Sequence, residues 1–254
     1  SLESDIHFLK EKIKLGADYI ITQMFFDNKK FFEFQDLCRK EGIDVPIIPG
    51  LHVSKDTEAL NLKEFIYKLD VPVIVGGAAT YTAALHLMRT GAAGVLVGFG
   101  GGAASATRKV LGIHAPMATA VADVAAARRD YMDESGGRYV HVIADGGLGT
   151  SGDLVKAIAC GADAAMLGTV LARAAEAPGQ GWHWGPEAVN ASLPRGQRMW
   201  VGSHGPLEQI LTGPSDTSDG TMNILGALRR SMATTGYSDV KEFQRVDVVA
   251  NSYR

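Results

Sequence analysis

Two alternating periodicities constrain what this chain can fold into more than any other feature of its sequence. Short runs rich in valine and isoleucine lead into glycine-containing turns, and longer amphipathic segments follow. This order is typical of βα units, in which parallel strands are buried on both faces and helices cover the sheet. Strands are predicted at Tyr19–Phe26, Val45–Ile48, Val71–Gly76, Gly94–Gly98, Val140–Ala144, Ala164–Leu167 and, near the end of the chain, Val246–Val249. Helices are predicted at Ile6–Leu15, Lys29–Lys40, Leu62–Tyr67, Thr82–Arg89, Met117–Met132, Gly152–Ala159 and Leu225–Thr234.

The pattern predicts an α/β fold of the (β/α) TIM-barrel type. About six βα units are recognisable, whereas a closed barrel of this kind has eight strands, so the sequence leaves closure of the barrel open. An open sheet would expose strand edges, and such edges favour a homo-oligomer. We expect a single barrel-like domain over residues 1–254, whose last part, residues 176–254, forms a flap and a C-terminal helical segment.

Composition and charge narrow the class of partner. The formal net charge is -3 and the pI is about 6.2, which favour neither nucleic acid nor an anionic membrane as a partner. No apolar stretch of about 18 residues and no signal-peptide pattern is found, so we expect a cytoplasmic protein. Cys38 and Cys160 lie among apolar residues in helix-like segments, and we interpret them as buried thiols rather than a disulfide or a metal site.

Two glycine-containing turns after successive predicted strands carry most of the functional signal. In TIM barrels the last two βα loops often hold a phosphate through backbone N–H groups. Glycines let the backbone approach the anion closely, and a following helix N-terminus adds positive potential. A phosphate site is therefore predicted at Gly146, Gly147, Gly168 and Thr169, with Asp145 accepting hydrogen bonds from ribose hydroxyls. In the alternative interpretation, the glycines only make turns and Asp145 only caps a helix.

A third glycine run, Gly98–Gly102, leads to Ser105 and is interpreted as either a flexible loop or a phosphate loop. Ser105 would be a nucleophile only if a base activated it. The sequence assigns no base, because its 7 histidines are scattered along the chain. An ordinary loop serine is the simpler interpretation.

From about His52 onward, these segments together resemble the IMP dehydrogenase/GMP reductase family. Residues 97–108, VGFGGGAASATR, are similar to the family's loop of the form VGxGxGxxCTTR. The blocks HVIADGGLGTSGDLVKAIACGADAAMLG and GTMNILGALRRSMATTGYSDVKEFQ are similar to its last barrel units and its C-terminal segment. The likeness is strongest to the bacterial IMP dehydrogenase-related branch, and residues 51–175 would be its barrel units.

That resemblance implies roles for the residues already singled out. Gly102 and Ala103 would lie beside the substrate phosphate, Asp145 would hold the ribose hydroxyls, and Gly147, Gly168 and Thr169 would bind phosphate. In the family, the loop cysteine attacks the purine ring and hydride passes to or from NAD(P). Here that position is Ser105, and a hydroxyl is far less ionised and less nucleophilic than a thiol. Ser105 is therefore expected to be inactive or nearly so.

The first fifty residues resemble a different barrel enzyme, methylenetetrahydrofolate reductase. The segment LKEKIKLGADYIITQMFFDNKKFFEFQDLCRKEGIDVPIIPG carries the likeness, and Gln23 matches a folate-contacting glutamine of that family. An inward-facing polar residue at a strand end is the simpler interpretation of Gln23. A flavin is not expected, because the family's catalytic carboxylates and most flavin contacts have no counterpart. Two unrelated families meeting near Gly50–His52 suggest an engineered or recombined chimera.

Three functions follow as hypotheses. The first is a chimeric scaffold with a residual phosphate or nucleotide site and no catalysis. The second is a purine-nucleotide oxidoreductase acting on IMP or GMP with NAD(P). The third is a flavin- or folate-binding protein.

Overall fold

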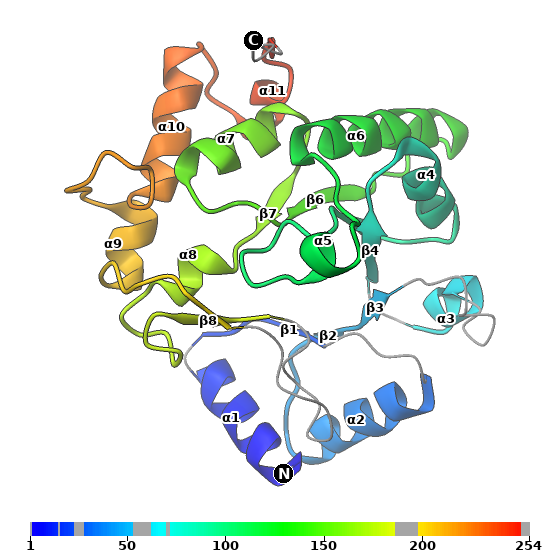
Figure 1. Cartoon of the computed structure of the whole chain (residues 1–254). Coiled ribbons are helices and arrows are strands. Elements are labelled where there is room, and N and C mark those ends of the chain that lie inside the picture. The colour runs from blue at the N-terminus through cyan, green and yellow to red at the C-terminus, as the bar shows by residue number, and fades with distance from the viewer. Residues whose placement is uncertain are drawn as a thin grey trace. The chain divides into compact units, whose positions relative to one another are not determined.

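The structure is a computed structural model that describes residues 2–14, 16–22, 28–52, 62–69, 72–185 and 198–249 (Figure 1). The chain forms two compact units. Unit 1 comprises residues 1–77 and 86–95, and unit 2 comprises residues 78–85 and 96–254. The boundary between them crosses two strands, β4 (Ile74–Ala78) and β5 (Gly94–Val97), as well as helix α4 (Tyr81–Arg89).

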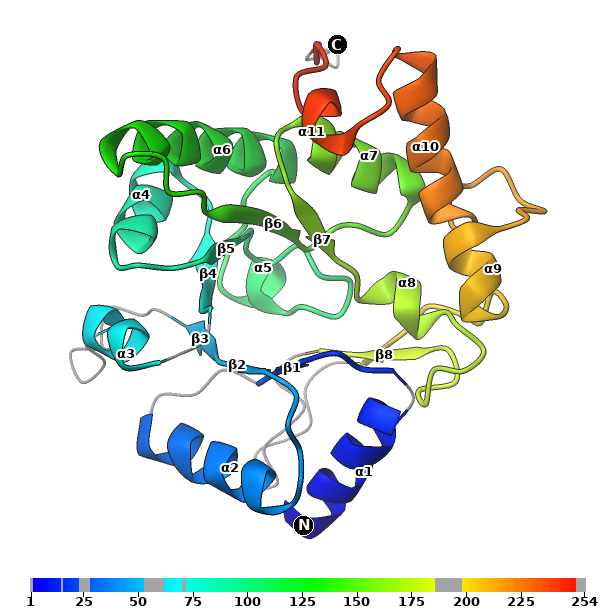
Figure 2. The same cartoon turned by 180° about the vertical axis from the view of Figure 1, so that it is seen from behind.

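Unit 1 contains short parallel strand pairs and the first three helices. Strand β1 (Ile20–Ile21) pairs with β2 (Ile47–Ile48), and β3 (Gly50–His52) pairs with β4. The helices are α1 (Leu2–Lys14), α2 (Asn28–Lys40) and α3 (Leu62–Lys68), and α1 and α2 lie on the same side of the β1–β2 pair (Figures 1 and 2). The core of this unit includes apolar side chains of these elements and of the loop between α2 and β2, namely Ile6, Ile20, Phe31, Cys38, Ile43 and Ile47.

Unit 2 continues the parallel sheet with the end of β4, then β5, β6 (His141–Asp145) and β7 (Ala164–Met166), in chain order. Its N-terminal helices are α5 (Thr107–Val110), α6 (Met117–Glu134), α7 (Ser151–Ala159) and α8 (Thr169–Ala172). An antiparallel pair, β8 (Trp182–Trp184) and β9 (Arg198–Trp200), precedes α9 (Leu207–Thr212), α10 (Ile224–Thr234) and α11 (Val240–Phe243).

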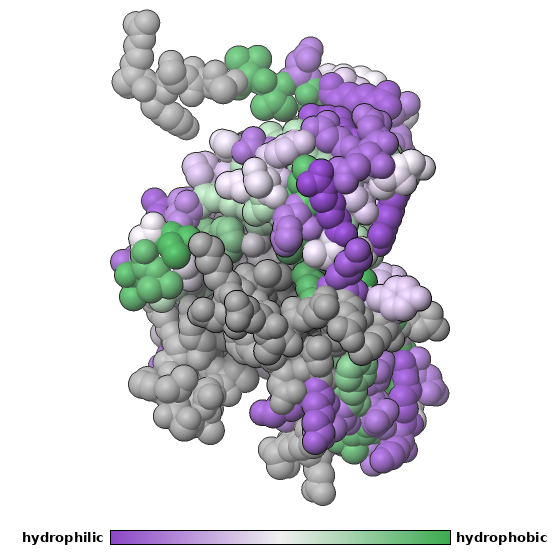
Figure 3. Space-filling view, turned by 90° about the vertical axis from the view of Figure 1, so that its right-hand side faces the viewer, coloured by the Kyte–Doolittle hydropathy of each residue, from purple (hydrophilic) through white to green (hydrophobic). Residues whose placement is uncertain are grey.

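The long helix α6 shows how the sequence forms the core of unit 2. Its buried face carries small and β-branched side chains at helical spacing, namely Ala120, Val121, Val124, Ala125 and Ala127. Alanines favour the helix and leave room for the sheet to approach. Helix α10 packs beside α7 in both views (Figures 1 and 2). On the face shown in Figure 3, hydrophilic side chains predominate among the coloured residues and hydrophobic ones gather in small groups.

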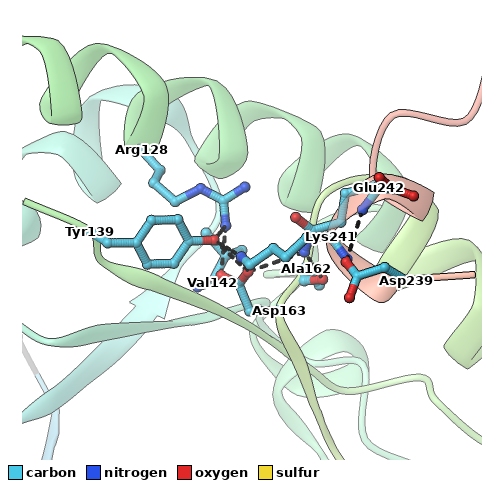
Figure 4. A network of polar contacts seen from close by, with 9 residues as sticks. Arg128, Tyr139, Val142, Ala162, Asp163, Asp239, Lys241 and Glu242 are labelled. Carbon is cyan, nitrogen blue, oxygen red and sulfur yellow. Dashed lines mark hydrogen bonds and ion pairs between the residues drawn. The ribbon is translucent and has the colours of Figure 1, made fainter. Parts of the chain in front are cut away.

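A buried carboxylate ties the C-terminal helix α11 to the sheet of unit 2 (Figure 4). Asp163, just before β7, accepts hydrogen bonds from Arg128 Nη1 at 2.6 Å and from the backbone N–H of Val142 at 2.8 Å. Its other oxygen accepts from the Tyr139 hydroxyl and from Lys241 Nζ, which comes from α11. The side chains of Asp163 and Arg128 are only 7% and 8% exposed, so this is a buried ion pair.

Several predicted elements need correction. Val246–Val249 is not a strand, because it has no neighbouring strand to pair with among the described residues. Within Tyr19–Phe26 only Ile20–Ile21 is described as strand, and residues 23–27 lie outside the described residues. The short helices α5, α8, α9 and α11 were not predicted. The parallel α/β architecture is confirmed, whereas hydrogen bonds among the described strands do not show a closed barrel.

Within the described ranges, the structure contains neither a membrane-spanning helix nor a cluster of metal-binding side chains. No helix there is both long and apolar enough to cross a membrane. No group of three or more His, Cys, Asp and Glu side chains there could hold a metal ion. Cys38 is buried and Cys160 half-buried, and both are free thiols whose pKa values burial raises.

Candidate functional site

The glycine loops after β5 and β6 pack against each other backbone to backbone. A Cβ atom on Gly101 would lie 3.1 Å from the carbonyl carbon of Gly146, and one on Gly146 would lie 3.1 Å from Cα of Gly101. A Cβ atom on Gly98 would lie only 2.4 Å from the carbonyl oxygen of Asp145. Side chains at these positions would force the loops apart. The glycine run that the sequence left open as a flexible loop or a phosphate loop therefore makes a packed contact, which brings the Ser105 loop next to Asp145–Gly147.

Ser105 occupies a turn in this loop and is half-buried. Its N–H donates to the Gly102 carbonyl at 3.0 Å, and its Oγ accepts from the Thr107 N–H at 3.3 Å. Gly102 and Ala103 are exposed at the tip of the loop. The contacts found for Ser105 within the described chain involve only these backbone groups, and none of them would act as a base. These contacts hold Ser105 within its own loop.

Asp145 ends strand β6 and is half-buried. Burial raises the pKa of its carboxyl above the ordinary aspartate value. Among the described residues, no side chain or N–H group donates a hydrogen bond to this carboxylate. A desolvated acceptor at a strand end, beside two glycine loops, is suited to bind hydroxyl groups of a ligand.

The strand register places the β7 loop beside the β6 loop. Asp145 lies opposite Met166, so Gly146–Gly147 and Gly168–Thr169 leave adjacent parallel strands at the same level. Arg173, in the segment after β7, donates from Nη1 to the Gly149 carbonyl at 2.9 Å, which links the two loops directly. The two glycine segments predicted to bind phosphate are therefore neighbours. The helices that follow differ, because α7 has 9 residues whereas α8 has only 4.

Sequence reasoning missed one residue at this end of the sheet, His183 on β8. Its Nδ1 lies 3.1 Å from Oγ1 of Thr169. A Cβ atom on Gly168 would lie 3.2 Å from its Cε1 and 3.3 Å from its Nε2, so the imidazole covers Gly168. Burial lowers the pKa of His183 below the ordinary histidine value. In the sequence, His183 is marked only by its place between Trp182 and Trp184, and this pattern does not indicate which residue the histidine contacts.

Gln23, the predicted folate-contacting residue, lies outside the described residues. The candidate site in unit 2 is therefore built, among the described residues, by the loops that follow β5, β6 and β7 and by the β8–β9 pair.

Comparisons with known proteins identify the relatives of this chain. Residues 26–191 match the family described as "IMP dehydrogenase / GMP reductase domain". An uncharacterized oxidoreductase of Mycolicibacterium smegmatis is 58% identical over 219 residues, which cover 83% of this chain and 58% of that protein. The inosine-5'-monophosphate dehydrogenase of Thermoplasma acidophilum is 42% identical over 141 residues, which cover 56% of this chain and 28% of the enzyme.

A solved structure shows the same relationship. The IMP dehydrogenase/GMP reductase-like protein from Corynebacterium glutamicum superposes with a TM-score of 0.78 at 47% sequence identity. The superposition covers 92% of this chain and 61% of that protein. This chain therefore spans only a little over half the length of the Mycolicibacterium smegmatis and Corynebacterium glutamicum proteins, and its match covers about a quarter of the Thermoplasma acidophilum enzyme.

These matches also correct the hypothesis of a fusion. The family match starts at residue 26, inside the fragment that resembled methylenetetrahydrofolate reductase, and the solved structure covers 92% of the chain. A junction near Gly50–His52 is therefore not supported. Since the family match spans well over half of the sequence, the chain belongs to the IMP dehydrogenase/GMP reductase family.

Proposed function

We propose that this chain forms the nucleotide-binding part of a purine-nucleotide oxidoreductase that acts on IMP or GMP with NAD(P). The observation that carries the proposal is the desolvated Asp145 carboxylate, which lacks a donor among the described residues and lies beside two neighbouring glycine loops. The names of the relatives, which are oxidoreductases or IMP dehydrogenases, support this reading over that of an inert scaffold.

In this proposal Asp145 accepts hydrogen bonds from the ribose hydroxyls. The phosphate lies at the neighbouring strand ends, where N–H groups and the Thr169 hydroxyl are its donors. The residues assigned to it are Gly102, Ala103, Gly146, Gly147, Gly168 and Thr169. A nucleotide fits this chemistry, because glycines leave the loop backbone open to the phosphate. The carboxylate accepts hydrogen bonds from sugar hydroxyls but would repel an anion.

NAD(P) is proposed as the cofactor because the chain belongs to the IMP dehydrogenase/GMP reductase family. When bound, it would accept or supply hydride. The contribution of this chain is to bind and orient the purine nucleotide.

Ser105 favours a second candidate, nucleotide binding without turnover. Its Oγ accepts a hydrogen bond from the Thr107 N–H in a local turn. A serine hydroxyl without a base is a poor nucleophile. Both candidates share the same binding site and differ only in whether chemistry follows.

Calorimetric titration with IMP and GMP tests the shared site. Asp145→Asn keeps the shape of the side chain but makes it a weaker acceptor of hydrogen bonds from the two ribose hydroxyls. We therefore expect the affinity for IMP and GMP to fall about tenfold, or roughly 1.4 kcal/mol. Asp133→Asn, an exposed change of equal charge on α6, is the matched control and should leave affinity unchanged. Failure of the unmodified chain to bind either nucleotide would refute the proposal. Formation of reduced cofactor with IMP and NAD(P) would then separate the two candidates.

A further inference from the structure

The β8–β9 pair presents different chemistry on its two faces. Successive side chains of a strand point to opposite sides. Trp182 and Trp184 share one face, where the Arg198 guanidinium lies 4.4 Å from one ring centroid and 5.4 Å from the other. Trp200 packs edge-on against Trp182 with centroids 5.3 Å apart. This cluster of three tryptophans and Arg198 holds the strand pair and turns His183 to the other face.

On that other face His183 meets two residues assigned above to phosphate. Its Nδ1 is at hydrogen-bond distance from Thr169 Oγ1, and its ring edge covers Gly168. The backbone of Gly168 has φ of -101°, which any residue can adopt. A Cβ atom here would lie 3.2 Å from the imidazole, so a side chain would require the ring to move by a few tenths of an ångström, whereas the backbone conformation does not require glycine.

We propose that His183 is a positioning residue for the nucleotide phosphate and acts through Thr169; the inference rests on the function proposed above. A hydroxyl that binds an anion must donate its hydrogen to it. It can do so only if its neighbour donates to the hydroxyl oxygen instead of accepting from it. Imidazole with hydrogen on Nδ1 donates to Thr169 Oγ1 and leaves the threonine hydrogen for the phosphate. His183 thus fixes the polarity of the Thr169 hydroxyl.

Substitutions at His183 separate this role from packing. His183→Phe fills the space but cannot donate, and we expect about tenfold weaker binding of IMP. His183→Asn has an amide nitrogen near the position of Nδ1 and should restore most of that affinity. Inosine, which lacks the phosphate, should bind the unmodified chain and His183→Phe with the same affinity. His204→Phe removes a similar histidine–threonine contact, 3.1 Å long, elsewhere in unit 2 and should change neither affinity.

A double substitution supplies a second measurement. Gly168→Ala alone should weaken IMP binding, since the new methyl group meets the imidazole. In a His183→Ala background the same change should have a much smaller effect, because the ring is gone. The coupling between the two positions would be absent if His183 did not cover Gly168.

The outcomes distinguish the two levels of inference. No binding of IMP or GMP by the unmodified chain would overturn the proposed function and the role of His183 with it. Binding of IMP that is equal in the unmodified chain and in folded His183→Phe would overturn the role of His183 alone. So would equal losses for IMP and inosine, because they would show that the imidazole supports the whole site rather than the phosphate.

Discussion

Substitution of Asp163 by asparagine should destabilise unit 2 strongly. The change removes the negative charge that faces Arg128, whose side chain is 8% exposed, and Lys241, whose side chain is 55% exposed (Figure 4). Removing one partner of a buried ion pair leaves the other charge desolvated and costs about 3–5 kcal/mol. Asparagine can still accept one hydrogen bond, so we expect about 3 kcal/mol. Lys241→Met leaves the buried pair intact and should cost only about 1 kcal/mol.

The same group predicts how stability depends on pH. Burial by itself would raise the pKa of Asp163, but hydrogen bonds from Lys241, Tyr139 and the Val142 N–H outweigh burial and lower the pKa from 3.8 to about 2. The folded state therefore binds this proton less readily than the unfolded state. The resulting stability is fully present above the unfolded pKa and is lost as pH falls from about 4 through about 2. A shift of this size corresponds to about 2 kcal/mol.

Urea unfolding of the unmodified chain and of Asp163→Asn at several pH values measures both effects. The difference in unfolding free energy between them should be about 3 kcal/mol near neutral pH and should shrink by about 2 kcal/mol at about pH 2. Taking the difference removes the contribution of the other carboxylates. Asp133→Asn on the exposed side of α6 should track the unmodified chain at every pH. A difference that is below 1 kcal/mol, or that stays constant with pH, would refute the argument that Asp163 is a buried, charged anchor.

Three further outcomes are expected. Gly98→Ala should lower the free energy of unfolding by about 1–3 kcal/mol, because Gly98 has φ of +128° and a Cβ atom there would lie 2.4 Å from the Asp145 carbonyl oxygen. Gly112 also has a positive φ but lies in open space, so Gly112→Ala should lower the free energy of unfolding less in the same urea titration. Ser105→Cys should not restore oxidation of IMP, since the contacts found for Ser105 give it no base; appearance of reduced NAD(P) would show a more complete site. Arg198 is not assigned to the phosphate, but its cation stacks on Trp182 in the cluster that holds the β8–β9 pair, so Arg198→Met should weaken IMP binding. Unchanged affinity in calorimetry would contradict a supporting role for that cluster.

The helices could be predicted from the sequence because their signal is local. The predicted range Met117–Met132 became Met117–Glu134, and Leu225–Thr234 became Ile224–Thr234. In each, apolar residues recur at the spacing of one helix face, and that spacing does not depend on distant parts of the chain. Val246–Val249 shows the opposite case. Its β-branched residues favour an extended backbone, but a strand also needs a neighbour, and the sequence of the segment does not specify one.

The candidate site could be predicted only where its residues follow strand ends. The sequence predicted that the loops of Asp145 and Gly168 are neighbours because parallel strands end at the same edge of a sheet, and the strand register agrees. His183 was missed because its contact with Thr169 depends on where the β8–β9 pair lies, and no local pattern fixes that. Asp163 was missed for the same reason, since its partners Arg128 and Lys241 are 35 and 78 residues away in sequence.

The glycines of the site look alike in the sequence, but the structure requires them for different reasons. Gly101 and Gly146 lie in close backbone contact, and Gly146 also has φ of +107°, whereas at Gly168 a side chain would press against the His183 ring. A Cβ atom on Gly147 would meet nothing closer than 3.7 Å, and one on exposed Gly102 nothing closer than 3.8 Å. The first group builds the site by close packing, whereas Gly102 and Gly147 leave open space beside their backbones. A ligand anion needs such space to reach N–H groups, so within the proposed function the backbones of these two residues join the Thr169 hydroxyl as contacts of the phosphate.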